Sequence, residues 1–210
     1  MINPEGTKDS VEIIDRHLAQ FFDLDEIMVL HEKDNARHPS DLFIVQPNKD
    51  RDYHLLLTCG MSNFPMKVPE YFNCLKHAEI MMLLPRDWPL NYEALSDEAY
   101  YWPVRAILQL SKYPRLNNTW LGFGHTVPLD QSRNPGHRFD SLLLLESIHL
   151  SEDFTYTEKG EKEIHFYSAF PIYKEEREFK LKHGTDKLLD LFERYDIEEI
   201  MDVNRRRVCQ

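Results

Sequence analysis

The sequence predicts an α/β domain in which helices pack against a central β-sheet. Three observations support this. Short apolar runs bounded by charge, proline or glycine have the length and composition of strands. The runs are continuously apolar rather than alternating, which is typical of strands covered on both faces. Other segments repeat their apolar residues at the spacing of one helix face. The expected strands span residues 27–30, 42–45, 55–58, 80–84, 142–145 and 164–170.

A first helix is expected near the N-terminus. Asp9 or Ser10 could cap it, because short polar side chains accept hydrogen bonds from the free N–H groups of a first helical turn. Val11, Ile14 and Leu18 follow at helical spacing. Two further helices are expected after the last strand: a charged one over residues 174–183 that ends at Gly184, and an amphipathic one over residues 186–195.

The middle of the chain predicts a longer helix that begins at Asp97. Its apolar face includes Val104 and Ile107. Pro103 should kink this helix unless it starts near Trp102, and Pro114 should end it. Residues 117–135 contain two glycines and two prolines and are expected to form a loop. Residues 151–163 are polar and are expected to be a hairpin connection or a mobile loop.

The length and composition indicate one folded domain over residues 1–210. The chain is 42% hydrophobic and 12% aromatic, which argues against disorder. No Gly/Ser-rich or Pro-rich linker divides it. The chain is therefore long enough to bury a substantial core around a single sheet.

The charge and the cysteines restrict the partners and the compartment. A net charge of −11 repels phosphate backbones, so we expect no nucleic-acid binding and favour a cationic partner. The start of the chain lacks the basic and apolar regions of a signal peptide, and its longest apolar stretch is too short to span a membrane. Cys59, Cys74 and Cys209 are odd in number and scattered, which favours a reducing cytoplasm.

The spacing of residues along the sequence tests for two kinds of site, a serine nucleophile and a metal site. Ser62 follows Gly60, but position 64 is Phe where a nucleophile elbow requires glycine. His54 and His125 could act as a base, yet no pattern connects either to Ser62. Cys59, Cys74 and His77 lack the paired spacing of metal sites. We therefore expect no catalysis, no cofactor and no metal, with a hydrolase or metal enzyme as a lesser alternative.

Glu79 opens an apolar strand, where a lone charge would be costly. We expect its carboxylate to hold neighbouring backbone N–H groups or an arginine such as Arg105, with ligand binding as the alternative. The glycine-rich GFGH segment at residues 122–125 has no helix after it that could present amides to a phosphate, and we interpret it as a turn.

The ordered set of motifs resembles the suppressor of fused domain family. The segments that carry the resemblance are DLFIVQP (41–47), LLLTCGMSNFPMKVPE (55–70), AEIMMLLPRDWPL (78–90), YWPVRAILQLSKYP (101–114), TWLGFGHTVP (119–128) and FPIYKEEREFKLKHGTDKLLDLFERYDI (170–197). The resemblance implies a mixed, twisted central sheet flanked by helices and no known catalysis. It also implies binding of protein partners, because animal members regulate transcription factors by binding them, and compact bacterial members include immunity proteins encoded beside toxins.

The family motifs supply the candidate site residues, whose role is either structural or in partner binding. These residues are Gly60, Met61, Ser62, Pro65, Met66, Glu79, Trp88, Trp102, Pro103, Gly124 and His125. In the turn after residue 59, Gly60 allows a backbone conformation closed to other residues, the methionines pack on the core, and Pro65 holds Phe64 extended. The tryptophans are expected mainly in the core.

The leading functional hypothesis is an immunity protein that blocks a basic toxin by direct binding. The predicted acidic contacts are Glu175, Glu176, Glu178, Asp186, Asp190 and Glu193. A solvated helix face is the simpler explanation for any one of them. The alternative is a regulatory scaffold of the animal type that captures an extended peptide along a sheet edge.

Overall fold

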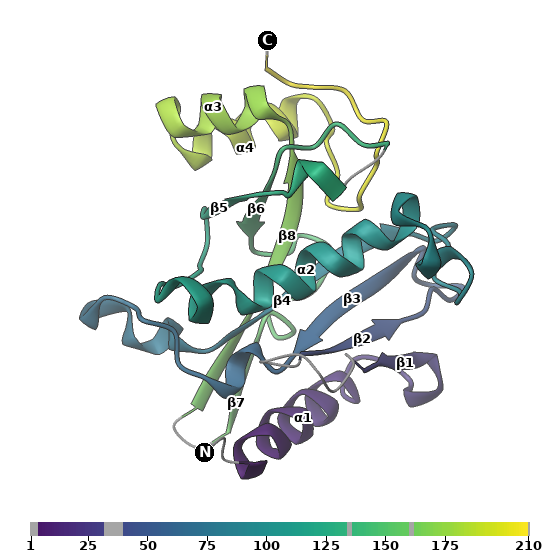
Figure 1. Ribbon diagram of the computed structural model, residues 1–210, viewed down its shortest axis with the longest axis vertical. Coiled ribbons are helices and arrows are strands. Elements are labelled where there is room, and N and C mark those ends of the chain that lie inside the picture. Colours follow the sequence, from purple (N-terminus) through teal and green to yellow (C-terminus); the bar gives the residue numbers. More distant parts are fainter. Residues whose placement is uncertain (1–3, 32–39, 134–135, 160–161, 210) are drawn as a thin grey trace.

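A mixed sheet, with eight strands among the residues that the structure describes, organises the protein. The computed structural model describes residues 4–31, 40–133, 136–159 and 162–209. In this part of the chain the strand order is β1-β2-β3-β4-β8-β6-β5, and β7 pairs with β8 beside this path (Figure 1). The predicted fold class, a mixed α/β sheet flanked by helices, is confirmed.

The first four strands form an antiparallel meander. They are β1 (Ile27–Leu30), β2 (Asp41–Val45), β3 (Tyr53–Cys59) and β4 (Ala78–Pro85). Each strand pairs with the next one in sequence. The apolar runs had predicted all four, with bounds within two residues of those observed.

The second half of the sheet joins the first through a parallel pair. Its strands are β5 (Thr126–Pro128), β6 (Ser141–Leu145), β7 (Tyr156–Lys159) and β8 (Lys162–Ile172). Strand β8 runs parallel to β4, from Ala78 opposite His165 to Met81 opposite Ser168. Its other neighbours, β6 and β7, are antiparallel to it. The mixed character of the sheet therefore comes from this one central pairing.

Two polar segments are more ordered than a loop prediction allows. The segment 117–135 contains β5, whose residues pair with Ser141–Leu143 of β6. The expectation of an unbroken loop was wrong there, because a three-residue strand depends on a distant partner and leaves little local pattern. In segment 151–163, β7 and β8 pair antiparallel, so the hairpin interpretation holds for the described residues.

In the described residues, four α-helices lie around the sheet. They are α1 (Pro4–Leu18), α2 (Glu98–Asn117), α3 (Lys174–His183) and α4 (Thr185–Arg194). Short 3₁₀ helices occupy Leu24–Glu26, Met61–Asn63, Glu70–Lys76, Ala94–Ser96 and Gln131–Arg133. No helix among the described residues is both long and apolar enough to cross a membrane.

The caps of two helices differ from expectation. Helix α1 starts at Pro4, a favourable first helical residue, so Ser10 lies buried inside the helix and does not cap it. In α2, Asp97 caps as predicted by accepting the Ala99 N–H at 2.9 Å. Pro114 does not end α2, since a proline inside a helix removes only one ladder bond. The helix ends instead at Asn118, whose φ is +51° and whose N–H bonds to the Pro114 carbonyl.

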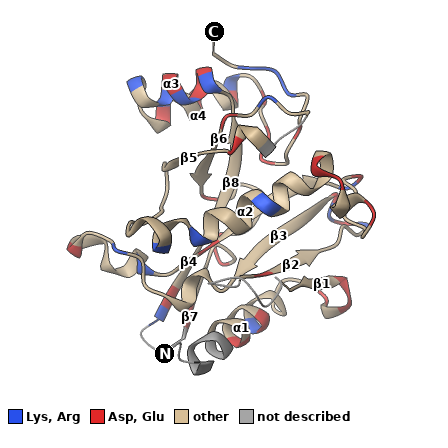
Figure 2. Ribbon diagram, viewed as in Figure 1, with Lys and Arg blue, Asp and Glu red and all other residues tan. Residues whose placement is uncertain are grey.

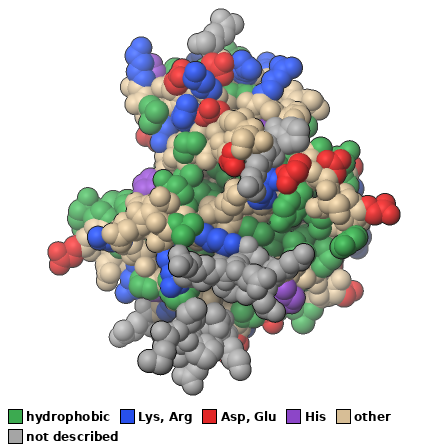
Figure 3. Space-filling model, viewed as in Figure 1, with side chains coloured by type: hydrophobic (Ala, Val, Ile, Leu, Met, Phe, Trp, Pro, Cys, Tyr) green, Lys and Arg blue, Asp and Glu red, His purple; other side chains and the backbone are tan. Residues whose placement is uncertain are grey.

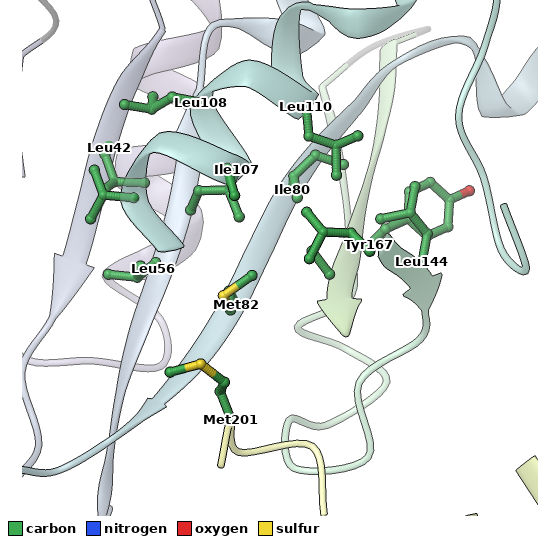
Figure 4. Packing of buried hydrophobic residues seen from close by; sticks show 14 of the residues in the cluster. Leu42, Leu56, Ile80, Met82, Ile107, Leu108, Leu110, Leu144, Tyr167 and Met201 are labelled. Atoms are coloured by element: carbon green, nitrogen blue, oxygen red, sulfur yellow. The ribbon is translucent and has the colours of Figure 1, made fainter. Parts of the chain in front are cut away.

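Alternate strand residues build separate cores on the two faces of the sheet. Leu42, Leu56, Ile80 and Met82 pack against α2, while their neighbours along the strands pack with α1. Figure 4 shows Ile107 and Leu108 of α2 over the strands that carry Leu42, Leu56 and Ile80. A third cluster joins β6 and β8 to α4. The continuously apolar strands are thus covered on both faces, as their composition predicted.

Replacing Ile107 by alanine should lower the free energy of unfolding by about 2–5 kcal/mol, because the side chain is fully buried and leaves a cavity in the α2 face of the core. Leu116→Ala in the same helix is the matched control. Its side chain is 64% exposed, so its effect should stay within about 0.5 kcal/mol. Urea unfolding followed by circular dichroism measures both. Equal midpoints for the two variants would contradict the assigned packing.

Candidate functional site

The Glu79 carboxylate is the centre of a buried polar cluster. Its side chain is fully buried at the start of β4. Oε1 accepts the backbone N–H groups of Gly60 and Ser62, both at 2.9 Å, and the Ser62 hydroxyl at 2.7 Å. Oε2 accepts the Thr58 hydroxyl at 2.7 Å, and the Thr58 oxygen accepts the Ile80 N–H at 2.9 Å. Burial raises the pKa of Glu79, while these hydrogen bonds oppose the rise because they stabilise the carboxylate.

The expected clamp on backbone N–H groups is therefore present, and Arg105 is not part of it. Arg105 pairs instead with Glu98 at the start of α2. The clamp fixes the Gly-Met-Ser turn between β3 and the short helix that follows. A carboxylate suits this position because it can accept several hydrogen bonds at once, here three at Oε1 and one at Oε2.

Ser62 belongs to the same cluster and is not arranged as a nucleophile. Its oxygen lies 2.7 Å from Glu79 Oε1, to which it donates, and 3.2 Å from the Ser10 oxygen. The Ser10 oxygen in turn accepts from Lys162 Nζ at 2.7 Å. Ser62 and Ser10 are both fully buried. A substrate carbonyl has no path to the Ser62 hydroxyl in this conformation, and no histidine ring hydrogen-bonds to it in the described residues.

The turn around Ser62 has the geometry that its sequence predicts. Gly60 has φ +132°, which residues with a Cβ rarely adopt. Phe64, before Pro65, is extended with φ −124° and ψ 130°. Met61 and Met66 are buried against the α2 core. These family-motif residues therefore shape the fold.

The outer side of this turn borders a shallow hollow against the C-terminal half of α2. The hollow encloses about 290 Å³ and is lined by residues that include Met61, Pro65 and Met66. Arg115 of α2 places its guanidinium 3.6 Å from the centre of the Phe64 ring, a cation–π contact. This contact holds the turn against the helix.

The remaining motif residues lie at two other places in the fold. Trp102 is buried beside Pro103 in α2, and Trp88, partly buried, packs on the same core and donates to the Tyr100 carbonyl at 3.1 Å. Gly124 has φ +76°, and a Cβ there would lie 2.9 Å from the Thr185 hydroxyl. His125 stacks edge-on against Trp120, and burial lowers its pKa. The structure thus places the motif residues at separate positions, from the buried core to the exposed Pro65, and does not bring them together as a reacting centre.

The candidate metal ligands are also separated by their environments. Cys59 is buried in the α1 core and Cys74 is exposed. His77 donates from its Nδ1–H to the Ser62 carbonyl, 2.8 Å away. Burial raises the pKa of the Cys59 thiol, which disfavours the thiolate that metals bind. Among the described residues, no group of three or more His, Cys, Asp or Glu side chains could hold a metal ion.

Glu176 was predicted to contact a partner, and its burial contradicts this. Its carboxylate forms a two-pronged ion pair with Arg205, at 2.8 and 2.6 Å, and also accepts the Tyr173 and Val208 N–H groups. The Arg205 guanidinium lies within 4.6–5.5 Å of the rings of Phe139, Phe170, Tyr173 and Phe192. Glu176 therefore fastens the C-terminal tail to α3 and β8. Sequence reasoning missed this pair because Arg205 lies far along the chain.

The other predicted acidic contacts stand at the surface, several beside a base. Glu175 pairs with Arg207 at 2.8 Å, Glu178 with Lys174 at 3.8 Å and Asp190 with Lys187 at 3.0 Å. Helix α3 accordingly carries both signs of charge along its length (Figure 2). Figure 3 shows the same mixture over the end of the molecule that carries α3. Asp186 and Glu193, on α4, are exposed.

The α4 pocket, an apolar hollow between α4, β6 and β8, combines two of these acids, Asp190 and Glu193, with the third core cluster. It encloses about 380 Å³. Its apolar lining includes Leu145, Phe170, Leu189 and Phe192. Its acidic lining is Glu146, Asp190, Glu193 and Glu199, and none of the residues that line it is basic. Sequence reasoning found Asp190 and Glu193 through the acidic run 186–202. It missed Glu146 because only tertiary structure brings β6 next to α4.

The comparisons with known proteins agree on one family. The family model described as suppressor of fused protein matches residues 36–206. Two similar solved structures are a suppressor of fused homologue from Neisseria gonorrhoeae and Drosophila Suppressor of Fused. The first is 17% identical with a TM-score of 0.68 and covers 97% of this chain and 98% of that chain. The second is 13% identical with a TM-score of 0.67 and covers 99% of this chain and 54% of the Drosophila chain.

A third structure is described as the Sufu–Fu complex. Its matching chain is 10% identical with a TM-score of 0.65, and the alignment covers 97% of this chain and 92% of that one. No curated protein sequence matches this chain. At these identities the structural matches establish the fold.

Replacing Glu79 by alanine should cost about 3–5 kcal/mol of unfolding free energy, because it leaves buried donors without an acceptor. Glu79→Gln keeps one oxygen for the Gly60 and Ser62 groups and should cost less. Chemical unfolding monitored by tryptophan fluorescence measures both. Glu70→Ala, at an exposed position, is the control and should change stability by less than about 0.5 kcal/mol. An alanine variant as stable as this control would refute the clamp.

Arg205→Lys should destabilise the protein by about 1–3 kcal/mol, because lysine cannot reproduce the two-pronged contact and leaves Glu176 under-bonded while buried. The matched control is Arg207→Lys. Arg207 pairs with Glu175 near the surface, where such a pair is worth about 0–1 kcal/mol. Thermal unfolding curves of the two variants should differ accordingly. Superimposable curves would show that the tail is not held by this pair.

Proposed function

Because this chain belongs to the suppressor of fused family, we propose that it is a single protein-binding domain without catalytic activity, which acts in the cytoplasm and neutralises a basic toxin encoded nearby by direct binding. The family supports the protein-binding part of this proposal, since one solved relative is described as a complex of Sufu with Fu. The toxin part rests on the charge of the chain and on the α4 pocket.

The α4 pocket is the observation that carries the proposal. A surface that combines apolar floor residues with exposed acidic rim residues suits a partner whose contact side chains are both apolar and cationic. The net charge of −11 adds a long-range attraction for the same partner and would speed the encounter. Toxins that cleave nucleic acid carry basic surfaces, since their substrate is a polyanion.

The absence of a reacting arrangement at Ser62 agrees with a binding role. Its hydroxyl is committed to a buried carboxylate, and His77 bonds to the backbone carbonyl of Ser62, not to its hydroxyl. A binding protein needs a stable and complementary surface. The Glu79 and Glu176 clusters supply rigidity to the elements that carry the α4 pocket and the motif turn.

Peptide capture at a sheet edge, as proposed for a regulatory scaffold, is the second candidate. The observation that favours it is the pair of edge strands, β1 and β5. Met28 and Val29 on β1 are 43% and 39% exposed, so an added strand could cover them. A gene neighbourhood without a toxin would favour this candidate over the immunity role.

Co-expression with the product of the neighbouring gene tests the proposal. That product alone should stop growth, and growth should return when this protein is made with it. The purified complex should weaken as ionic strength rises, because its attraction is largely electrostatic. A harmless neighbouring product, or toxicity that persists in the presence of this protein, would refute the immunity role. Salt-independent binding would refute charge steering.

A further inference from the structure

We propose that the α4 pocket is a socket for one basic side chain, an arginine or a lysine, of a protein partner. This inference rests on the proposed function, because it names the group that the partner would insert. The pocket has an apolar floor and an acidic wall. These match the two parts of a long basic side chain, its aliphatic stem and its charged head. Its aliphatic stem packs on apolar surface while its charged head meets carboxylates.

The floor of the pocket is part of the third core cluster. Phe170 of β8 and Phe192 of α4 are each 5% exposed and pack against one another with ring centres 5.0 Å apart. Leu145 and Leu189 border them from β6 and α4 and are only partly buried. This floor belongs to regular elements on both sides, so the socket exists before any partner arrives.

Glu199 is the buried member of the acidic wall of the pocket. The residue is 7% exposed. Its Oε2 atom accepts from the Ser147 hydroxyl at 2.9 Å and from the Ile148 and His149 N–H groups at 2.9 and 3.2 Å. The His149 ring also approaches this oxygen at 3.3 Å. Oε2 therefore fixes the carboxylate to the turn after β6.

Besides the acidic lining, the other oxygen of Glu199 also favours a cationic ligand. Oε1 is buried and accepts no hydrogen bond from the described residues. A buried carboxylate oxygen without a donor is costly, and the low dielectric around it strengthens its attraction for a nearby cation. The best compensation is a guanidinium or ammonium group seated in the pocket that Glu199 lines.

The rim adds carboxylates that are free to approach a cation. Glu146 and Glu193 line the pocket and are exposed, and Asp190 pairs with Lys187 in an exposed ion pair that is readily exchanged. Ile148, 78% exposed, stands beside them and would contact an apolar neighbour of the inserted side chain. The expected recognition element is thus a basic residue next to an apolar one.

Nuclear magnetic resonance titration of the intact chain with three six-carbon probes tests the socket. The probes are hexylguanidinium chloride, 1-hexanol and sodium hexanoate. Hexylguanidinium should shift amide signals of residues 145–148, 189–193 and 197–199 and should bind at least fivefold more tightly than hexanol, with hexanoate weakest. Equal binding of hexylguanidinium and hexanol, or shifts centred elsewhere, would overturn the proposal. So would self-association of the free chain through this surface, because a second copy would then occupy the pocket.

Two variants assign the effect to the carboxylates. Glu193→Gln and Glu199→Gln should each weaken hexylguanidinium at least threefold and leave hexanol unchanged. Glu193 is exposed, so its variant keeps the test valid even if Glu199→Gln disturbs the turn at residues 147–149. The control is Glu178→Gln, an exposed acid on α3 that does not line the pocket. Loss of guanidinium binding in this control as well would indicate a general charge effect and overturn the socket.

The same positions separate the socket from the immunity role. Glu193→Lys should abolish protection in the co-expression assay, whereas Glu178→Lys should retain it. If the wild-type chain protects and Glu193→Lys protects equally, the socket is wrong and the immunity role stands. If hexylguanidinium binds as expected but the neighbouring gene product is harmless, the socket stands and the immunity role is wrong.

Discussion

The structure depends on one buried carboxylate. Glu79 accepts hydrogen bonds from both sides of the turn that follows β3, and the same group lies at the start of β4. Through Ser62 and Ser10 it is linked to α1, and Ser10 is bonded in turn to Lys162 at the start of β8. Four elements are therefore linked, directly or through Ser62 and Ser10, to one fully buried carboxyl group. Such a cluster stabilises a fold only when every member is bonded, so the residues around it are tightly constrained.

This constraint explains why the most conspicuous motif of the sequence contains no reactive site. The glycine, serine and methionines of the turn are each used, by conformation, hydrogen bonding or packing, to close the turn over Glu79. Apolar and acidic side chains line a surface pocket elsewhere, between α4, β6 and β8. The residues that close the turn are thus separate from the acidic and apolar residues that line the α4 pocket.

The sequence was sufficient for the parts of the fold that rest on local patterns. Strands β1 to β4, β6 and β8 followed from apolar runs, and α3 from its charges and Gly184. It was insufficient wherever the cause lies far along the chain. Strand β5 exists because β6 is beside it, Glu176 is buried because Arg205 reaches it, and the α4 pocket joins Glu146 to Glu193. The Glu79 clamp was predictable because a charge in an apolar strand requires partners, and a glycine turn nearby supplies them.

The parallel pairing of β4 with β8 delays completion of the sheet while the nascent chain is still being synthesised on the ribosome. Strands β1 to β4 can assemble as soon as they emerge, but residues 165–168, which complete the far side of β4, are synthesised much later. Until then the open edge of an apolar strand is a template for other chains. Aggregation would compete with folding most strongly in that interval, which is where a chaperone would be of greatest use.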